Sequence, residues 1–215
     1  SKLMFTCLNW RPSLEGNSNS NFARLIIVGV PGVGKTTVIS RASEILNQRG
    51  LTTKVVVFGS LMFENAKKLG VTDRDSMRRL SVSTQRRLQE MAAHDIKAIQ
   101  DTNVLIDTHL FITTDEGRYP GIPGHLLDIL APTHLVLIIA DPEDIFKRRR
   151  QDDTRNRDLI SVQSIRSDLE VATMMIASTS VLCGAPFKFI YNRDGMSDEA
   201  VNGIVEIISK GSGRK

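Results

Sequence analysis

The residues of this chain best suited to chemistry form one short glycine-rich run that ends in a lysine and a threonine. Gly29–Thr36 satisfies the pattern G-x-x-x-x-G-K-[ST], the phosphate-binding P-loop. Glycines let a backbone wrap around a phosphate with its N–H groups pointing inward, at the positive end of the helix that follows. We therefore predict a nucleoside triphosphate site made by Gly29, Val30, Pro31, Gly32, Val33, Gly34, Lys35, Thr36 and Thr37.

Within this run, Lys35 is expected to reach the β- and γ-phosphates, and the Thr36 hydroxyl is expected to hold Mg²⁺. A second metal candidate is Asp107, which directly follows the apolar run Val104–Ile106. Ligands gather at the carboxyl ends of parallel strands, and Mg²⁺ keeps several of its waters. We therefore expect Asp107 to hold Mg²⁺ through water, with a capping or turn aspartate as the alternative.

Arginine is concentrated in one segment, which contains Lys147–Arg150 and then Arg155 and Arg157 after an acidic pair. Phosphoryl transfer spreads negative charge over oxygens that guanidinium groups stabilise once water is excluded. We predict a short arginine-rich lid over about residues 148–158, and we expect Lys147 and Arg149 to belong to a solvated face. An RNA-binding arm is disfavoured because no aromatic residue for base stacking is interleaved.

A second glycine- and proline-rich segment is Gly117–Gly124, shortly after Asp107. Prolines stiffen such a loop and glycines let a ligand approach closely. The segment suits a rigid wall for a second substrate, and an ordinary tight turn is the alternative.

The elements that must position these residues alternate between strand and helix. Expected strands are 25–28, 53–58, 104–106, 134–140 and 187–191. Expected helices are 37–49, 61–69, a long one over 72–100 opened by the capping pattern Thr72-x-x-Asp75, one after Asp141, 161–182 and 201–208. This order predicts an α/β fold of the P-loop NTPase type, a three-layer sandwich with a central five-stranded parallel sheet and helices on both faces.

Composition sets the wider limits of the interpretation. The 215 residues suit one domain, the net charge of +4 suits anionic ligands without demanding nucleic acid, and 41% of residues are hydrophobic. Two cysteines far apart exclude a four-cysteine zinc site and favour a reducing, cytoplasmic setting. No stretch is apolar enough for a membrane span. We divide the chain into a flexible N-terminal extension (1–21), which could instead be a docking arm, a P-loop domain (22–210) and a loose tail (211–215).

Six motifs in order resemble the archaeal adenylate kinases. They are G-V-P-G-V-G-K-T-T, F-G-S-L-M-F-E, D-R-D-x-M-R-R-L-S, I-D-T-H, G-R-Y-P-G-I-P-G and D-D-T-R-N-R, within residues 23–209. The resemblance implies the reaction ATP + AMP ⇌ 2 ADP with Mg²⁺, a short lid without zinc, and a homotrimer. ATP and AMP are then the expected partners, and the lack of an apolar span leads us to expect no membrane partner.

The resemblance also assigns roles to single residues. Arg148, Arg155 and Arg157 would be lid arginines that act with Lys35 in catalysis. The AMP site would be made by Phe58, Gly59, Ser60, Arg78 or Arg79, Thr108, His109, Tyr119, Pro120 and Gly121. Arg78 and Arg79 cannot both face one cleft because adjacent helix positions diverge. His109 could equally be a histidine that bonds the backbone.

Two other functions fit some of these features. One is a P-loop kinase for another nucleoside monophosphate or a small metabolite, because no motif identifies the base. The other is an ATP-dependent RNA-binding module that uses the basic segment, for which salt-dependent RNA retention would be diagnostic.

Overall fold

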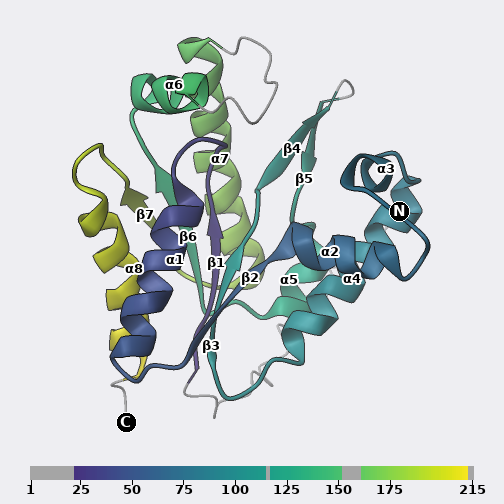
Figure 1. Cartoon of the computed structure of the whole chain (residues 1–215), viewed down its shortest axis with the longest axis horizontal. Helices are drawn as coiled ribbons and strands as arrows, with labels where there is room; N and C mark the ends of the chain where they lie inside the picture. Colours follow the sequence, from purple (N-terminus) through teal and green to yellow (C-terminus); the bar gives the residue numbers. More distant parts are fainter. Residues whose placement is uncertain (1–21, 115–116, 152–160, 213–215) are drawn as a thin grey trace, which may run out of the picture.

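Five parallel strands form the centre of the molecule, in the order β2-β3-β1-β6-β7 (Figure 1). The computed structural model describes residues 22–114, 117–151 and 161–212. Its central strands are β1 (Arg24–Val28), β2 (Thr53–Val57), β3 (Asn103–Asp107), β6 (His134–Ile139) and β7 (Phe187–Tyr191). The predicted five-stranded parallel sheet is confirmed.

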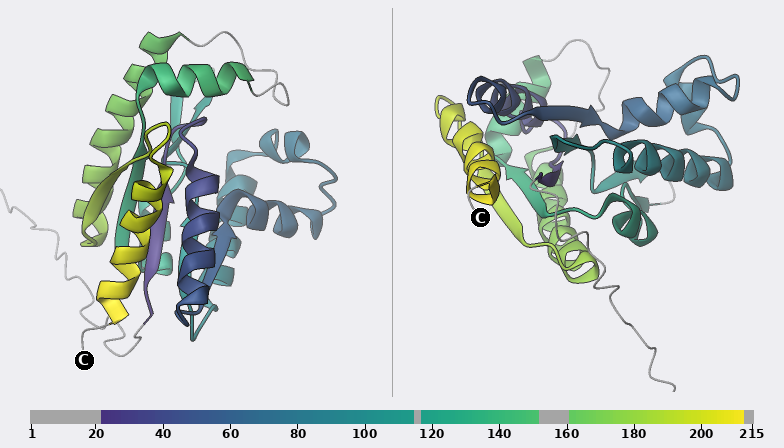
Figure 2. Two further views of the ribbon diagram at one scale, coloured as in Figure 1. Left: turned by 60° about the vertical axis from the view of Figure 1, so that its left-hand side comes forward. Right: turned by 90° about the horizontal axis from the view of Figure 1, so that it is seen from below.

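Helices cover both faces of this sheet, which confirms the predicted layers (Figure 2). The helices α1 (Lys35–Gln48) and α8 (Ser197–Ser212) pack together on one face. On the other face α7 (Val162–Cys183) packs against β6, and the short α5 (Gly124–Leu130) packs against α7. The helix α6 (Pro142–Gln151) lies beyond the carboxyl edge of the sheet and contacts α7 (Figure 1).

The core is formed by apolar strands whose side chains are buried on both faces of the sheet. Every residue of β3 is buried, as expected for a central strand of a parallel sheet that is covered on both faces. In α1 the buried residues recur at helical spacing, as Val38, Ile39, Ala42 and Leu46. Together these elements anchor the loops at the carboxyl edge, where the chemistry-bearing residues lie.

The single long helix expected over 72–100 is wrong, because the segment forms two helices. They are α3 (Arg74–Arg78) and α4 (Val82–Lys97). Asp73 caps the first by accepting a hydrogen bond from the Ser76 amide at 2.8 Å, and Ser81 caps the second by accepting from the Thr84 amide at 3.2 Å. A second capping residue inside a charged stretch therefore divides the helix. The preceding α2 (Phe58–Lys67) begins directly after β2.

A β-hairpin takes the place of the glycine- and proline-rich loop. The strands β4 (Phe111–Thr114) and β5 (Gly117–Pro120) pair antiparallel, with Ile112 opposite Tyr119. The expectation of a loop over Gly117–Gly124 is therefore wrong for its first half. All four residues of β5 are exposed, so the strand carries no apolar alternation by which it could be identified.

Three predicted features lie wholly or partly outside the described residues: the extension 1–21, the lid beyond Gln151, and the end of the tail. Gly211 and Ser212 form the end of α8. Across the described ranges, no helix is both long enough and apolar enough to span a membrane.

Candidate functional site

The P-loop connects β1 to α1 at the carboxyl edge of the sheet (Figure 1). Gly32 and Gly34 have φ angles of +84° and +85°, which favour glycine. Both also lie in close contact with other segments. A Cβ on Gly32 would lie 2.8 Å from Cγ of Arg149, and one on Gly34 would overlap the side-chain amide of Asn192. Conformation and packing thus both require glycine at these two positions.

Three predicted residues meet where β3 ends and α1 begins. The Lys35 ammonium forms an ion pair with Asp107, and the side chains are 8% and 7% exposed. The Thr36 hydroxyl donates a hydrogen bond to Oδ2 of Asp107 at 3.4 Å. Burial lowers the pKa of Lys35 to about 8. A cation, a carboxylate and a hydroxyl therefore lie together at the N-terminus of a helix, a place that attracts anions.

Two arginines of α6 contact the P-loop backbone from outside. Arg148 donates from Nη1 to the Val33 carbonyl at 3.1 Å, and Arg149 donates from Nε to the Pro31 carbonyl at 2.8 Å. The expectation that Arg149 belongs to a solvated face is wrong, because it is half-buried against the loop. Lys147, in contrast, has a side chain that is 70% exposed.

Sequence reasoning did not select Asn192 as a site residue. Asn192 directly follows β7, and Asp107 likewise lies at the end of β3. Its side chain is buried and donates from Nδ2 to the same Val33 carbonyl at 2.8 Å. The shared position at the carboxyl end of a strand is the signal that could have found it.

The residues at the start of α2 that were predicted to bind AMP differ in how deeply they are buried. Phe58 is only 2% exposed and belongs to the core, whereas Gly59 and Ser60 are half-buried. Arg74, which sequence reasoning did not select, donates from Nη2 to the Ser60 hydroxyl at 2.8 Å. Its guanidinium also lies 5.6 Å from the centre of the Phe63 ring. A cation from α3 therefore reaches the start of α2.

The paired arginines selected from the sequence lie at the end of α3. The side chain of Arg79 is exposed, and that of Arg78 lies outside the part of the chain that the structure describes. The contact with Ser60 therefore belongs to Arg74 in this structure.

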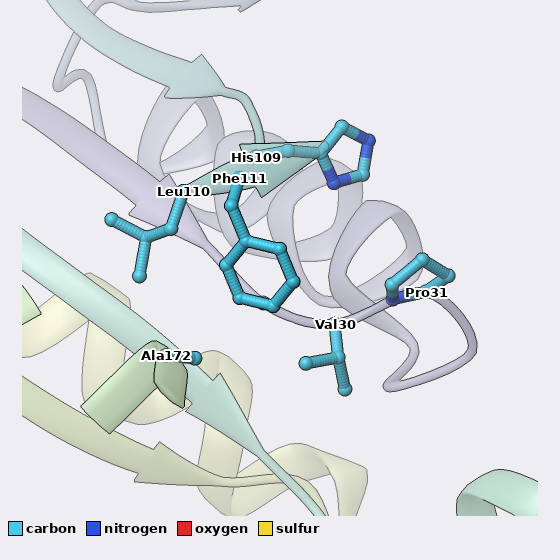
Figure 3. A pocket seen from close by; sticks show the side chains of 7 residues that line it. Val30, Pro31, His109, Leu110, Phe111 and Ala172 are labelled. Atoms are coloured by element: carbon cyan, nitrogen blue, oxygen red, sulfur yellow. The ribbon is translucent and has the colours of Figure 1, made fainter. Parts of the chain in front are cut away.

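The segment after β3 forms one wall of a pocket beside the P-loop (Figure 3). Thr108 is buried, and the exposed His109 lines the pocket with Leu110 and Phe111. Val30 and Pro31 form the facing side, and Ala172 of α7 closes one end. The pocket thus joins the P-loop to the base of the β4–β5 hairpin.

The hairpin is held at its base and along its side. The Gly121 amide donates to the Leu110 carbonyl at 2.7 Å, and a Cβ on Gly121 would overlap the His109 carbonyl. Arg118 forms an ion pair with Asp168 of α7 at 2.8 Å. Tyr119 and Pro120, which were predicted to belong to the AMP site, are exposed on β5. Arg155 and Arg157 lie outside the described residues.

Comparison with known proteins agrees with this geometry. Residues 28–166 match a family model described as AAA domain. The chain is 39% identical over 186 residues to a protein named adenylate kinase from Methanocaldococcus jannaschii, covering 86% of this chain and 97% of the relative. It is 42% identical over 187 residues to a protein of the same name from Thermoplasma acidophilum, covering 86% and 98%.

Solved structures show the same fold at low sequence identity. A shikimate kinase from Acinetobacter baumannii in complex with shikimate has a TM-score of 0.58 and 16% identity, over 90% of this chain and 96% of the other. A shikimate kinase from Bacteroides thetaiotaomicron has a TM-score of 0.53 and 14% identity, over 87% and 98%. At these identities the similarity establishes the P-loop kinase fold and no substrate.

Proposed function

The chain belongs to the adenylate kinase family, and from this membership we propose that it transfers one phosphoryl group from ATP to AMP to give two ADP. It is a nucleoside monophosphate kinase. The observation that carries the proposal is the buried contact of Lys35 with Asp107, beside Thr36, at the end of the P-loop. We propose that Gly29–Thr37 bind the triphosphate of ATP, with Lys35 at the β- and γ-phosphates.

Thr36 and Asp107 have the oxygen ligands that suit Mg²⁺, and their oxygens lie 3.4 Å apart. We propose that they hold the ion, Asp107 through water. When bound, Mg²⁺ would neutralise charge on the β- and γ-phosphate oxygens. The chain's own contribution is to set a hydroxyl and a buried carboxylate at the end of the loop that holds those phosphates.

On the acceptor side we propose that AMP lies between the start of α2, the segment after β3 and the hairpin. Ser60 would offer a hydroxyl, and Arg74 would add its charge to that of Arg78 or Arg79 near the AMP phosphate. Gly59 would allow close approach, and buried Phe58 would support this wall from below. The other proposed contacts are Thr108, His109, Tyr119, Pro120 and Gly121.

The reaction needs no protein nucleophile. An oxygen of the AMP phosphate attacks the γ-phosphorus of ATP, and the bond from that phosphorus to the β–γ bridging oxygen breaks, which leaves ADP at both sites. Lys35, Arg155 and Arg157 would stabilise the charge that spreads over the transferred group. Arg148, whose Nη1 donates to the Val33 carbonyl, would add its positive charge from beside the loop. Closure of the lid would exclude water, which otherwise competes as acceptor.

We further propose a cytoplasmic homotrimer. The resemblance to archaeal adenylate kinases supports the trimer. The presence of only two cysteines supports a reducing compartment.

A coupled assay of ADP formation from ATP with AMP, CMP, UMP or GMP tests the proposal. We expect AMP to be the preferred acceptor, because polar groups that a wrong base leaves unpaired discriminate strongly. An analogue with two adenosines joined by five phosphates should bind much more tightly than ATP, since it occupies both sites at once.

Two outcomes would redirect the assignment. If ATP with AMP yields no ADP above simple hydrolysis while another acceptor reacts readily, only the P-loop kinase class survives. RNA retention that falls steeply with salt, without turnover, would favour the binding module instead.

A further inference from the structure

The loop after the last strand contains two side chains that the proposed mechanism does not use: Asn192 contacts the P-loop directly, and Asp194 contacts Arg148. Asn192 is 6% exposed, and its backbone amide donates to the Ile139 carbonyl at 2.8 Å, so the sheet holds it in place. From that position its side-chain amide donates to the Val33 carbonyl at 2.8 Å. Its side chain also fills the space where Gly34 would carry a Cβ.

Arg148 donates to the same Val33 carbonyl from the other element at this edge, α6. Its Nη2 donates to the Asn192 carbonyl at 3.2 Å, and its Nε donates to Asp194 at 3.0 Å. All three guanidinium nitrogens therefore have partners. The Arg148 side chain is 23% exposed and that of Asp194 is 58% exposed, so the carboxylate holds the arginine from the solvent side.

These contacts matter because of peptide geometry. In a trans peptide the C=O of one residue and the N–H of the next point in opposite directions within one plane. Two donors outside the loop hold the Val33 oxygen outward, so the Gly34 N–H must point inward, to where the P-loop holds phosphate. Arg149 applies the same constraint to the Pro31–Gly32 peptide. Glycine offers little resistance to rotation of these planes, so hydrogen bonds from outside the loop add a constraint that the glycines do not supply.

We propose that Asn192 and Asp194 are positioning residues for ATP. Asn192 fixes the Val33–Gly34 peptide plane directly, and Asp194 does so through Arg148. The inference rests on the proposed function only in requiring that the P-loop binds ATP. The ligand class is therefore a nucleoside triphosphate, and the affected site is the donor side.

Asn192→Ala tests the direct contact, with Asn47→Ala as the matched control. Asn47 also bonds the backbone through its side chain, at 3.0 Å to the Thr53 carbonyl and 2.9 Å from the Thr53 amide. We expect Asn192→Ala to weaken ATP binding, measured by calorimetry without AMP, and to lower kcat, each by about tenfold, because a preorganised donor is lost. KM for AMP should stay near wild type. The control should lose stability without either effect.

Asp194→Ala tests the indirect contact through Arg148. It also provides a test of the proposal if the Asn192→Ala variant does not fold. Its control is Asp198→Ala, because Asp198 also forms an ion pair with an arginine, Arg41 of α1. We expect Asp194→Ala to lower kcat/KM for ATP about fivefold, the effect of one lost hydrogen bond. The Asp198 variant should match wild type.

The proposal is overturned if the Asn192 and Asn47 variants bind ATP equally well, or if the Asp194 and Asp198 variants have equal kcat/KM for ATP. Because ATP affinity is measured without AMP, this test does not depend on whether the protein is an adenylate kinase. If the wild-type protein makes no ADP from AMP but binds ATP, the adenylate kinase proposal fails while the Asn192 comparison still decides this one.

Discussion

The ammonium group of Lys35 and the carboxylate of Asp107 form an ion pair that is buried between the start of α1 and the end of β3. Neither charge is buried alone, because each offsets part of the cost of removing the other from water. The two groups proposed for phosphate and metal binding are therefore partners of each other in this structure. Binding of a metal-bound triphosphate would give each a new partner of opposite charge.

Lys35→Ala should lower kcat by roughly 10²-fold or more, because it removes a preorganised charge from the transferred phosphoryl group. Steady-state kinetics with ATP and AMP measure this, and circular dichroism checks the fold. The control is Lys54→Ala, which changes an exposed lysine on β2. Near-normal turnover in the Lys35 variant would remove the lysine from the mechanism.

The pKa of Lys35, lowered by burial to about 8 from 10.5, predicts how stability changes with pH. Between pH 8 and 10.5 the folded state has lost a proton that the unfolded chain keeps, so the free energy of unfolding rises with pH there. Below pH 8 the Lys35 ammonium is charged in both the folded and the unfolded state, so its contribution to stability no longer changes with pH. Relative to Lys35→Met, wild type should therefore gain about 3 kcal/mol in stability from pH 7 to pH 11.

Urea denaturation at the two pH values, without metal or nucleotide, measures this difference. Titrating groups remote from Lys35 cancel because both proteins contain them in the same surroundings. A stability difference that is the same at both pH values would show that Lys35 titrates in the folded protein as it does in the unfolded chain.

Arg155→Ala and Arg157→Ala should each reduce kcat more than they weaken AMP binding, since a lid acts mainly on the transition state. Lys147→Ala is the control, because that side chain is 70% exposed. Loss of AMP affinity alone would contradict the lid role. Unchanged kinetic constants would mean that the arginines form a solvated face.

Removal of Mg²⁺ should stop turnover without unfolding the protein. EDTA should abolish ADP formation while the circular dichroism spectrum is unchanged, and added Mg²⁺ should restore activity, because the ion neutralises phosphate charge and does not hold the fold together. Elemental analysis should find no stoichiometric zinc. Tightly held zinc, or unfolding in EDTA, would refute the prediction.

Arg74→Ala should raise KM for AMP about tenfold and leave KM for ATP unchanged, because a charge-assisted contact on the acceptor side is lost. Arg86→Ala, an exposed arginine on α4, is the control. The result would be contradicted if Arg74→Ala had no effect while Arg78→Ala or Arg79→Ala raised KM for AMP.

Local signals in the sequence were sufficient for the sheet and for the P-loop. Apolar runs marked all five central strands, and the glycine pattern marked the turn between β1 and α1. These local signals were insufficient where a capping residue interrupts a helical pattern and where a strand has no buried side. Ser81 caps a new helix inside a stretch with helical periodicity, and β5 pairs with β4 although every residue of β5 is exposed and no apolar alternation marks it.

The sequence by itself determined which residue types stand at the carboxyl ends of the strands, because strand, turn and helix preferences act over a few neighbouring residues. Only the tertiary structure decided which of them meet. Lys35 meets Asp107, and Val33 meets Asn192, because crossover connections bring β1 beside β3 and set β6 and then β7 on its other side. Such contacts depend on strand order and helix packing, and these are set by burial of the whole core, which no short segment encodes.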